Sequence, residues 1–285
     1  MTTLTEYRVR LPQHGAGFRD VVLLEGPTGW GELSPLPGYP SDPAACRRAA
    51  EEAATVPFPP ARRTRIRVNA LVPAVEPDAA AGLAAGWADV KVKVGDVGDV
   101  DRVAAVRDAI GPHARLRVDA NGAWDVDDAV ATIARLARFD IELVEQPVET
   151  LEDLATVRRR VTVPVAADEC VRTLDDAHRL AAIDAADALV LKVQPLGGIA
   201  ATLDVAAAAG VALVVSSMHE TSVGLAAGLA LAAALDDLPF ACGLGTAVLL
   251  AADVVDDPLV PVDGWLTVRR PEPSHALLAR YGVGG

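Results

Sequence analysis

The chain has 285 residues, of which 51% are hydrophobic, so it can bury one large core or two modest ones. Its formal net charge is -13, which argues against nucleic acids and anionic membrane surfaces as partners, because phosphate binding depends on lysine and arginine. The remaining class is a globular protein that acts on small molecules.

Export and metal binding by thiols are also disfavoured. The cysteines, Cys46, Cys170 and Cys242, lie far apart and form no CxxC pair, so they indicate neither a zinc site nor a disulfide framework. The first residues lack the basic segment and apolar core of a signal peptide. The longest apolar run, 224–235, is shorter than the roughly 20 residues of a membrane span. We expect a cytoplasmic protein in which this run is a buried helix.

Residues 1–64 predict a small α+β domain. Period-2 patterns predict strands at 6–11 and 20–25, a Gly-Pro-rich loop follows at 29–40, and helical spacing appears at 44–54. We expect this domain to cap the main one, and the tail at 258–285 to pack back on it.

Residues 65–257 repeat one unit, a β-branched run followed by a polar turn and an Ala/Leu/Arg-rich helix. The predicted strands are 67–72, 89–94, 116–119, 141–145, 163–168, 188–192, 212–216 and 240–243. The polar residues that close successive strands lie 23 to 27 residues apart, which is the period of a (β/α) barrel. An open doubly wound sheet has a similar period. A closed barrel is favoured because functional candidates follow at least five strands, whose ends converge on one mouth.

Lysine is rare in this chain. Only three of the 26 basic residues are lysines, namely Lys91, Lys93 and Lys192, and all three lie in apolar strand segments. Unlike arginine, a crowded lysine can lose its proton and act as a base. Lys91 and Lys93 are two residues apart, so they share one face of their strand, and we expect each to lower the pKa of the other. The competing interpretation is that the three lysines are retained by chance on a solvated surface.

Three acids close three consecutive strands. Asp119, Glu145 and Asp168 end the segments RVDAN, LVEQP and AADE, and three converging carboxylates would repel one another without a cation. Hard oxygen ligands with room for water and substrate predict a Mg²⁺ site, in which Mn²⁺ can substitute. Asn121 lies on the same face as Asp119 and is placed to orient a water or a ligand carboxylate. Alternatively, each acid only caps the helix that follows it.

Weaker candidates follow the last strands. The hydroxyls of Ser216 and Ser217, and the backbone around Gly243 and Gly245, are placed to receive a second substrate carboxylate, although the glycines equally permit a tight turn. His219 is either a base or a structural residue. Cys170 has no histidine partner nearby in the sequence and reads as a buried thiol.

Together, the motifs KVKVG, RVDANGAW, VEQPV, AADE, LKVQPLGG and SSMHET resemble the enolase superfamily. They are most similar to its muconate-lactonising branch and, within that branch, to the o-succinylbenzoate synthase family. The resemblance covers nearly the whole chain, including the capping domain. The short QHGAGF segment, where a loop is expected to close over the substrate, departs from the family pattern.

The resemblance implies that Lys93 removes the proton α to a substrate carboxylate and that Lys91 assists it. It also implies that Asp119, Glu145 and Asp168 hold Mg²⁺, and that Lys192 faces the other side of the substrate as an acid/base or a fixed cation. The implied reaction is dehydration of 2-succinyl-6-hydroxy-2,4-cyclohexadiene-1-carboxylate to 2-succinylbenzoate, a step of menaquinone synthesis. We expect a small-molecule carboxylate substrate and a protein that can act as a monomer.

Other functions remain open. An N-succinylamino acid racemase, a dipeptide epimerase or a cycloisomerase of the same branch would use the same lysines and acids. A Schiff-base aldolase would use Lys192 as the nucleophile and would leave the three acids unexplained. A non-catalytic ligand-binding barrel would leave the retained lysines unexplained.

Overall fold

The structure is a computed structural model that describes residues 3–15 and 17–283. An antiparallel sheet opens the chain, with strands β1 (Thr5–Pro12), β2 (Phe18–Gly26) and β3 (Gly29–Leu33) in that order. Strand β3 corrects the prediction of a loop from residue 29. Helix α1 (Pro43–Thr55) packs on this sheet, where a Cβ at Gly31 would meet the carbonyl oxygen of Ala50 at 1.9 Å. Only glycine allows so close an approach of helix and strand.

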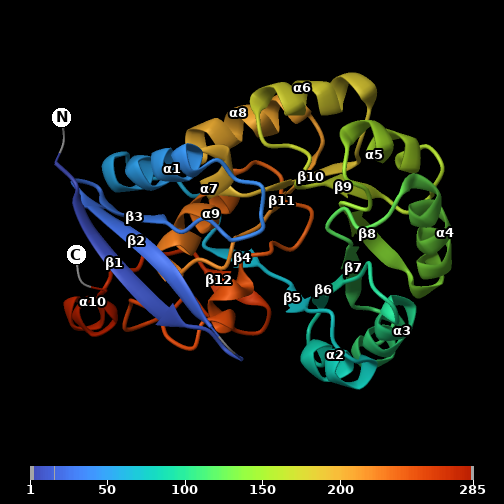
Figure 1. Ribbon diagram of the computed structural model, residues 1–285, viewed down its shortest axis with the longest axis horizontal. Coiled ribbons are helices and arrows are strands. Elements are labelled where there is room, and N and C mark those ends of the chain that lie inside the picture. The colour runs from blue at the N-terminus through green and yellow to red at the C-terminus, as the bar shows by residue number, and fades with distance from the viewer. Residues whose placement is uncertain (1–2, 16, 284–285) are drawn as a thin grey trace.

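The main sheet has seven parallel strands in sequential order, as a barrel requires. They are β5 (Ala70–Val72), β6 (Asp89–Lys93), β7 (Arg115–Asp119), β8 (Ile141–Glu145), β9 (Val165–Ala167), β10 (Ala188–Leu191) and β11 (Ala212–Val215). The strands follow the predicted positions, and Figure 1 shows helices along their outer side. The protein is therefore an α/β barrel with an added N-terminal sheet.

The helices between and after these strands bury one face against them. They are α2 (Pro77–Ala84), α3 (Asp99–Ile110), α4 (Val126–Leu136), η1 (Ala137–Phe139), α5 (Leu151–Arg158), α6 (Leu174–Ile183), α7 (Val193–Leu196), α8 (Ile199–Ala209), α9 (Ser222–Ala234) and η2 (Gly245–Leu249). Helix α9 is buried along almost its whole length, as the apolar run predicted. Within the described ranges, no helix combines the length and hydropathy needed to cross a bilayer.

The eighth predicted strand, 240–243, does not form a regular strand. Cys242 and Gly243 make isolated parallel bridges to Val68 and Ser216, and these bridges close the ring between β11 and the start of the barrel. The carbonyl of Ala241, at the start of this segment, accepts a hydrogen bond from the Arg117 side chain at 2.7 Å. The position of the strand was predicted correctly, but its regularity was not.

The predicted strand 67–72 is divided in two. Its first part is β4 (Arg65–Arg67), which pairs antiparallel with β12 (Trp265–Thr267) of the tail. The pairing with the tail continues for one more residue, since the amide of Val68 donates to the carbonyl of Gly264 at 2.9 Å, and the amide of Asn69 then donates to the carbonyl of Cys242 at 3.1 Å. Strand β5 then joins the barrel.

The tail lies against the N-terminal sheet. Helix α10 (His275–Tyr281) contacts β1, and Figure 1 shows the two side by side. Val9, Leu23 and Leu278 belong to one buried apolar cluster. These contacts support our proposal of a capping domain at 1–64, a barrel at 65–257 and a tail at 258–285.

Candidate active site

A cavity of about 440 Å³ lies at the C-terminal ends of the parallel strands, beneath the loop that follows β3. Of the predicted site residues, all but Glu145 line it: Lys91, Lys93, Asp119, Asn121, Asp168, Lys192, Ser216, Ser217, Gly243 and Gly245. Glu145 lies just behind the wall, where its carboxylate accepts a hydrogen bond from Lys91. The structure thus gathers at one mouth residues that are up to 154 positions apart in the sequence, because parallel strands end on one side.

Strand β6 carries the paired lysines to the acids of β7 and β8. The Nζ atom of Lys91 lies 2.8 Å from both Asp119 Oδ2 and Glu145 Oε1, and the Nζ atom of Lys93 lies 2.6 Å from Asp119 Oδ2. Asp119 is fully buried, whereas Lys93 keeps 28% of its side chain exposed and faces the cavity. Lys93 is therefore the more accessible member of the pair.

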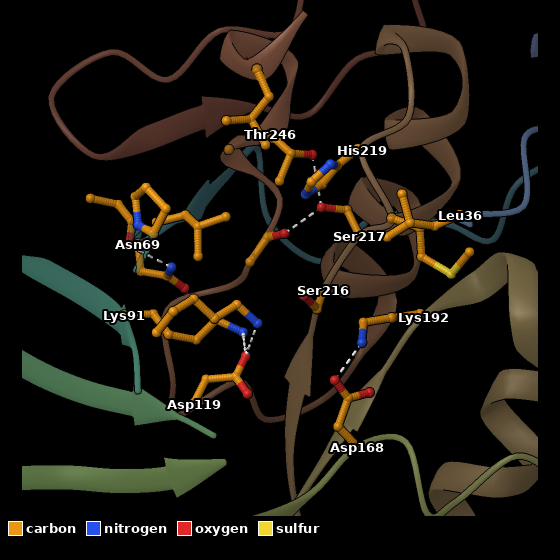
Figure 2. Close-up of a pocket in the computed structure, with 18 of the residues that line it drawn as sticks. Leu36, Asn69, Lys91, Asp119, Asp168, Lys192, Ser216, Ser217, His219 and Thr246 are labelled. Carbon is orange, nitrogen blue, oxygen red and sulfur yellow. Dashed lines mark hydrogen bonds and ion pairs between the residues drawn. The ribbon is translucent and has the colours of Figure 1, made fainter. Parts of the chain in front are cut away.

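Lys192 follows β10 and reaches the cavity from the far side of the barrel. Figure 2 shows Lys91 with Asp119 on one side of the pocket and Lys192 with Asp168 on the other. The Lys192 ammonium group also lies 4.2 Å above the ring of Tyr39, whose hydroxyl donates to Asp168 Oδ1 at 2.9 Å. Each of these two walls therefore carries a lysine ammonium group paired with an aspartate carboxylate.

The neighbouring carboxylates set the direction of the pKa shifts of Lys91 and Lys192. Burial alone would lower the pKa of Lys91, but Asp119 and Glu145 outweigh it and raise that pKa above its usual value. The pKa of Lys192 is raised in the same way, chiefly by Asp168. We expected Lys93 to lower the pKa of Lys91. Two buried carboxylates have the larger effect on that pKa, because each has an oxygen 2.8 Å from the Lys91 ammonium group.

Among the residues that the structure describes, no group of three or more His, Cys, Asp and Glu side chains is arranged as a metal site. Ammonium groups lie against the acids instead. Burial, together with repulsion by Asp119, raises the pKa of Glu145 to about 8, so the acids are crowded enough to favour added positive charge. A donor set of carboxylate oxygens alone fits a hard divalent cation.

Asn121 connects the lysine pair to an acid that the sequence analysis did not single out. Its Oδ1 atom accepts from Lys93 Nζ at 2.6 Å, and its Nδ2 atom donates to Glu169 Oε1 at 2.8 Å. The other Glu169 oxygen is buried without a hydrogen-bond partner in the described part of the chain. Glu169 therefore fixes which end of the Asn121 amide faces Lys93.

Hydroxyl groups line the part of the cavity that follows β11. Ser217 Oγ donates to the carbonyl of Gly243 at 2.5 Å and lies 2.9 Å from Thr246 Oγ1. A Cβ at Gly243 would meet Ser216 Oγ at 2.5 Å, so this glycine is required for the close packing of the two segments. Both interpretations of the glycines, turn and ligand contact, remain compatible with this geometry.

His219 and Cys170 are poor candidates for a base or a nucleophile. Burial, reinforced by the positive charge of Arg19 and Lys93, lowers the pKa of His219 to about 4, so its ring is neutral at pH 7. Burial raises the pKa of the Cys170 thiol to about 12, as expected for a structural cysteine.

Tyr39 and Glu169 were not predicted as site residues. Tyr39 lies in the loop after β3, and burial and nearby acids, Asp168 first among them, raise its pKa and keep it protonated. In the sequence, Tyr39 is one of two aromatic residues, with Trp30, in the Gly-Pro-rich segment 29–40, and nothing local distinguishes it as a site residue. Its contact with Asp168 spans 129 positions, which no local pattern reveals.

Comparison with known proteins agrees with this architecture. Residues 75–273 match the family described as enolase C-terminal domain-like, and residues 9–54 match the family described as enolase N-terminal domain-like. The chain is 54% identical to the o-succinylbenzoate synthase of Thermobifida fusca (strain YX), over 94% of this chain and 87% of that protein. It is 46% identical to the o-succinylbenzoate synthase of Mycolicibacterium smegmatis, over 95% and 86% of the two chains.

The fold is shared more widely. The crystal structure of 2-chloromuconate cycloisomerase from Rhodococcus opacus 1CP superposes with a TM-score of 0.87, at 24% identity, over 99% of this chain and 100% of that one. At this identity the likeness concerns the fold alone. Family models over most of the chain and near full-length relatives lead to one conclusion: the chain belongs to the enolase superfamily and, within it, to the o-succinylbenzoate synthase family.

Proposed function

We propose that this protein is an o-succinylbenzoate synthase, a lyase that dehydrates 2-succinyl-6-hydroxy-2,4-cyclohexadiene-1-carboxylate to 2-succinylbenzoate. The observation that carries the proposal is the placement of Lys93 and Lys192 on facing walls of one cavity, each against a buried acid. Relatives named o-succinylbenzoate synthase, 46% and 54% identical to this chain, support the choice of substrate. The reaction belongs to menaquinone synthesis.

Enzymes of the enolase superfamily use a divalent metal ion, and we propose Mg²⁺ here, with Mn²⁺ as a substitute. Asp119, Glu145 and Asp168 would hold it. When bound, such an ion supplies positive charge beside the enediolate that forms when a proton α to a carboxylate is removed. Tyr39 would hold Asp168 in place through its hydrogen bond to Oδ1.

Lys93 is the proposed general base. It is the more exposed lysine of the pair. Its Nζ atom donates a hydrogen bond to Asn121 Oδ1 at 2.6 Å, which holds the amine in one position at the cavity wall. In the reaction, the substrate C–H bond breaks, the proton moves to Lys93 Nζ, and the C–O bond then breaks. The proton and the departing hydroxide leave together as water, and the ring becomes aromatic.

Lys192 is proposed to act as a fixed cation across the substrate from Lys93. Its pairing with Asp168 and its raised pKa favour the charged form, which suits charge stabilisation better than attack on a carbonyl. Lys91 is proposed to tune Lys93 and to contact the substrate carboxylate. Ser216, Ser217 and the backbone at Gly243 and Gly245 would receive the second carboxylate of the substrate.

A racemase of N-succinylamino acids is the second candidate. Lysines on facing walls are what a two-base racemisation requires, because one lysine removes a proton and the other returns a proton to the opposite face. The synthase is preferred because the full-length relatives carry that name.

The deciding experiment measures both reactions with the Mg²⁺-loaded protein. A spectrophotometric assay follows dehydration of the cyclohexadiene substrate, and polarimetry follows racemisation of an N-succinylamino acid. Efficient dehydration is the expected result. Racemisation without dehydration would overturn the proposed substrate and leave the proton-abstraction mechanism in place.

We further propose that the protein acts in the cytoplasm and can function as a monomer. The three free cysteines are compatible with a reducing compartment.

A further inference from the structure

Arg19, in β2, joins the capping domain to the barrel through backbone carbonyls. Its Nη1 atom donates to Pro35 O at 2.9 Å, its Nη2 atom to Met218 O at 3.1 Å and to Ser34 O, and its Nε atom to His219 O at 3.3 Å. The residue is only 4% exposed, and no carboxylate in residues 3–15 and 17–283 forms a salt bridge with it. One guanidinium group therefore serves two pairs of consecutive carbonyls.

These carbonyls belong to the two segments that wall one side of the cavity. Ser34 and Pro35 precede Leu36, which lines the cavity, in the loop after β3. Met218 and His219 follow β11 and also line the cavity. Figure 2 shows Leu36, Ser217 and His219 together on this side of the pocket. Arg19 itself lies outside the cavity lining and contacts the wall from behind.

The barrel segment held by Arg19 has an unusual backbone. His219 has a φ of 58°, a left-handed conformation that costs a non-glycine residue about 1 kcal/mol or more. The bond from Arg19 Nε to the His219 carbonyl is one of the contacts that hold this turn. Without Arg19, we expect the turn at His219 to become more mobile and to lose its connection to the loop after β3.

We propose that Arg19 is a positioning residue that sets the capping-domain wall of the substrate cavity by holding residues 34–35 and 218–219 in register. This inference rests on the proposed function, because it assigns that wall to substrate binding rather than to the proton transfer at Lys93. A wall displaced by about 1 Å can cost up to about 100-fold in efficiency. The loss should appear mainly in KM, because the base and its partners remain in place.

Arg270 offers a matched control. It also donates to three backbone carbonyls of the capping domain, Thr28 O and Trp30 O at 2.9 Å and Ala53 O at 2.5 Å. None of these residues lines the cavity. Arg270 thus has the same chemistry and a similar stabilising role, but no contact with the wall.

The test compares Arg19→Gln, Arg19→Lys and Arg270→Gln as Mg²⁺-loaded full-length enzymes. For Arg19→Gln we expect KM for the cyclohexadiene substrate to rise about tenfold or more, with kcat within about threefold of the wild type. The KM of Arg19→Lys should lie between those of the wild type and Arg19→Gln, because a lysine ammonium group can bind some of the four carbonyls but cannot span all of them. Arg270→Gln should lower the melting temperature and leave KM unchanged.

Hydrogen exchange measured by mass spectrometry supplies a readout that needs no turnover. Amides of 34–41 and 216–221 should exchange faster in Arg19→Gln than in Arg270→Gln. An unchanged KM in folded Arg19→Gln, or an equal rise in Arg270→Gln, would overturn the proposal. If the wild type does not turn over the substrate, the proposed function fails, and the exchange rates still decide whether Arg19 holds the wall. Should Arg19→Gln not fold, Arg19→Lys takes its place in both measurements.

Discussion

The same three strands, β6, β7 and β8, carry ion pairs at both ends, and the two ends are built from different residues. At the floor of the barrel, Arg117 Nε lies 2.6 Å from Glu142 Oε2, and Arg67 Nε lies 3.6 Å from Asp89 Oδ2. At the mouth, Lys91 and Lys93 face Asp119 and Glu145. The cation of the ion pairs is thus arginine at the floor of the barrel and lysine at its mouth.

The difference follows from what each cation can do. An arginine keeps its proton at any physiological pH and binds carboxylates with a rigid fork, which suits a packed floor where Arg117 also lies 5.2 Å from the Phe240 ring centroid. A lysine can exchange its proton, which suits a cavity that admits a substrate. The sequence had indicated only one half of this division, namely that the three lysines are retained for chemistry that arginine cannot perform.

Metal removal should give the largest contrast between the two ends. EDTA is expected to abolish turnover and Mg²⁺ to restore it, because Asp119, Glu145 and Asp168 are the proposed ligands. The floor ion pairs use arginine as their cation and contain none of the proposed metal ligands, so EDTA should leave the fold and the circular dichroism spectrum unchanged. Full turnover in EDTA, together with borohydride trapping of a carbonyl substrate on Lys192, would instead favour a Schiff-base enzyme.

Exchanging the two cations tests their division of labour directly. Lys93→Arg should lower kcat by about 10³-fold or more, because a guanidinium group cannot act as a base. The reverse exchange at the floor, Arg117→Lys, should keep kcat close to the wild-type value. Steady-state kinetics measure both, with circular dichroism to confirm folding. A Lys93→Arg enzyme with near-normal kcat would remove Lys93 from its role.

Breaking a floor pair should cost stability instead of activity. Arg117→Met leaves Glu142 without its buried partner and should lower the free energy of unfolding by about 3 kcal/mol, measured by urea denaturation. Arg115→Met removes a second, exposed arginine from the same glutamate and should cost less than about 1 kcal/mol. Equal losses in the two variants would show that burial does not set the cost.

The smallest expected effect concerns a buried acid between the capping domain and the barrel. Burial raises the pKa of Glu32 to about 7 from 4.5, although Ser34, Thr221 and Gly224 donate hydrogen bonds to it. Between these values the folded state holds a proton that the unfolded state has lost, so stability falls as pH rises from 4.5 to 7. Denaturation at several pH values should show this slope.

Glu32→Gln should reduce that slope without removing it, because the pKa of the neighbouring buried acid Glu220 is also raised by burial. A variant with the full wild-type slope would assign the effect to other groups.

Periodicity and spacing predicted most of the barrel, and the structure places the predicted candidates at or just behind its mouth. Prediction missed contacts between distant segments: the Arg117 side chain binds a carbonyl in the predicted eighth strand, and the tail pairs with β4. It also missed Tyr39 and Glu169, because their partners Asp168 and Asn121 lie on other elements.

By itself the sequence determined the order of the strands, the closed barrel and the convergence of Lys93, Lys192 and the three acids. These follow from side-chain periodicity and from the geometry of parallel strands, which are local rules repeated along the chain. Only the tertiary structure decided that Asp119 and Glu145 raise the pKa of Lys91, and that Arg19 joins the capping domain to the barrel. Both depend on distances between segments that are remote in the sequence, and such distances are fixed only when the whole chain packs.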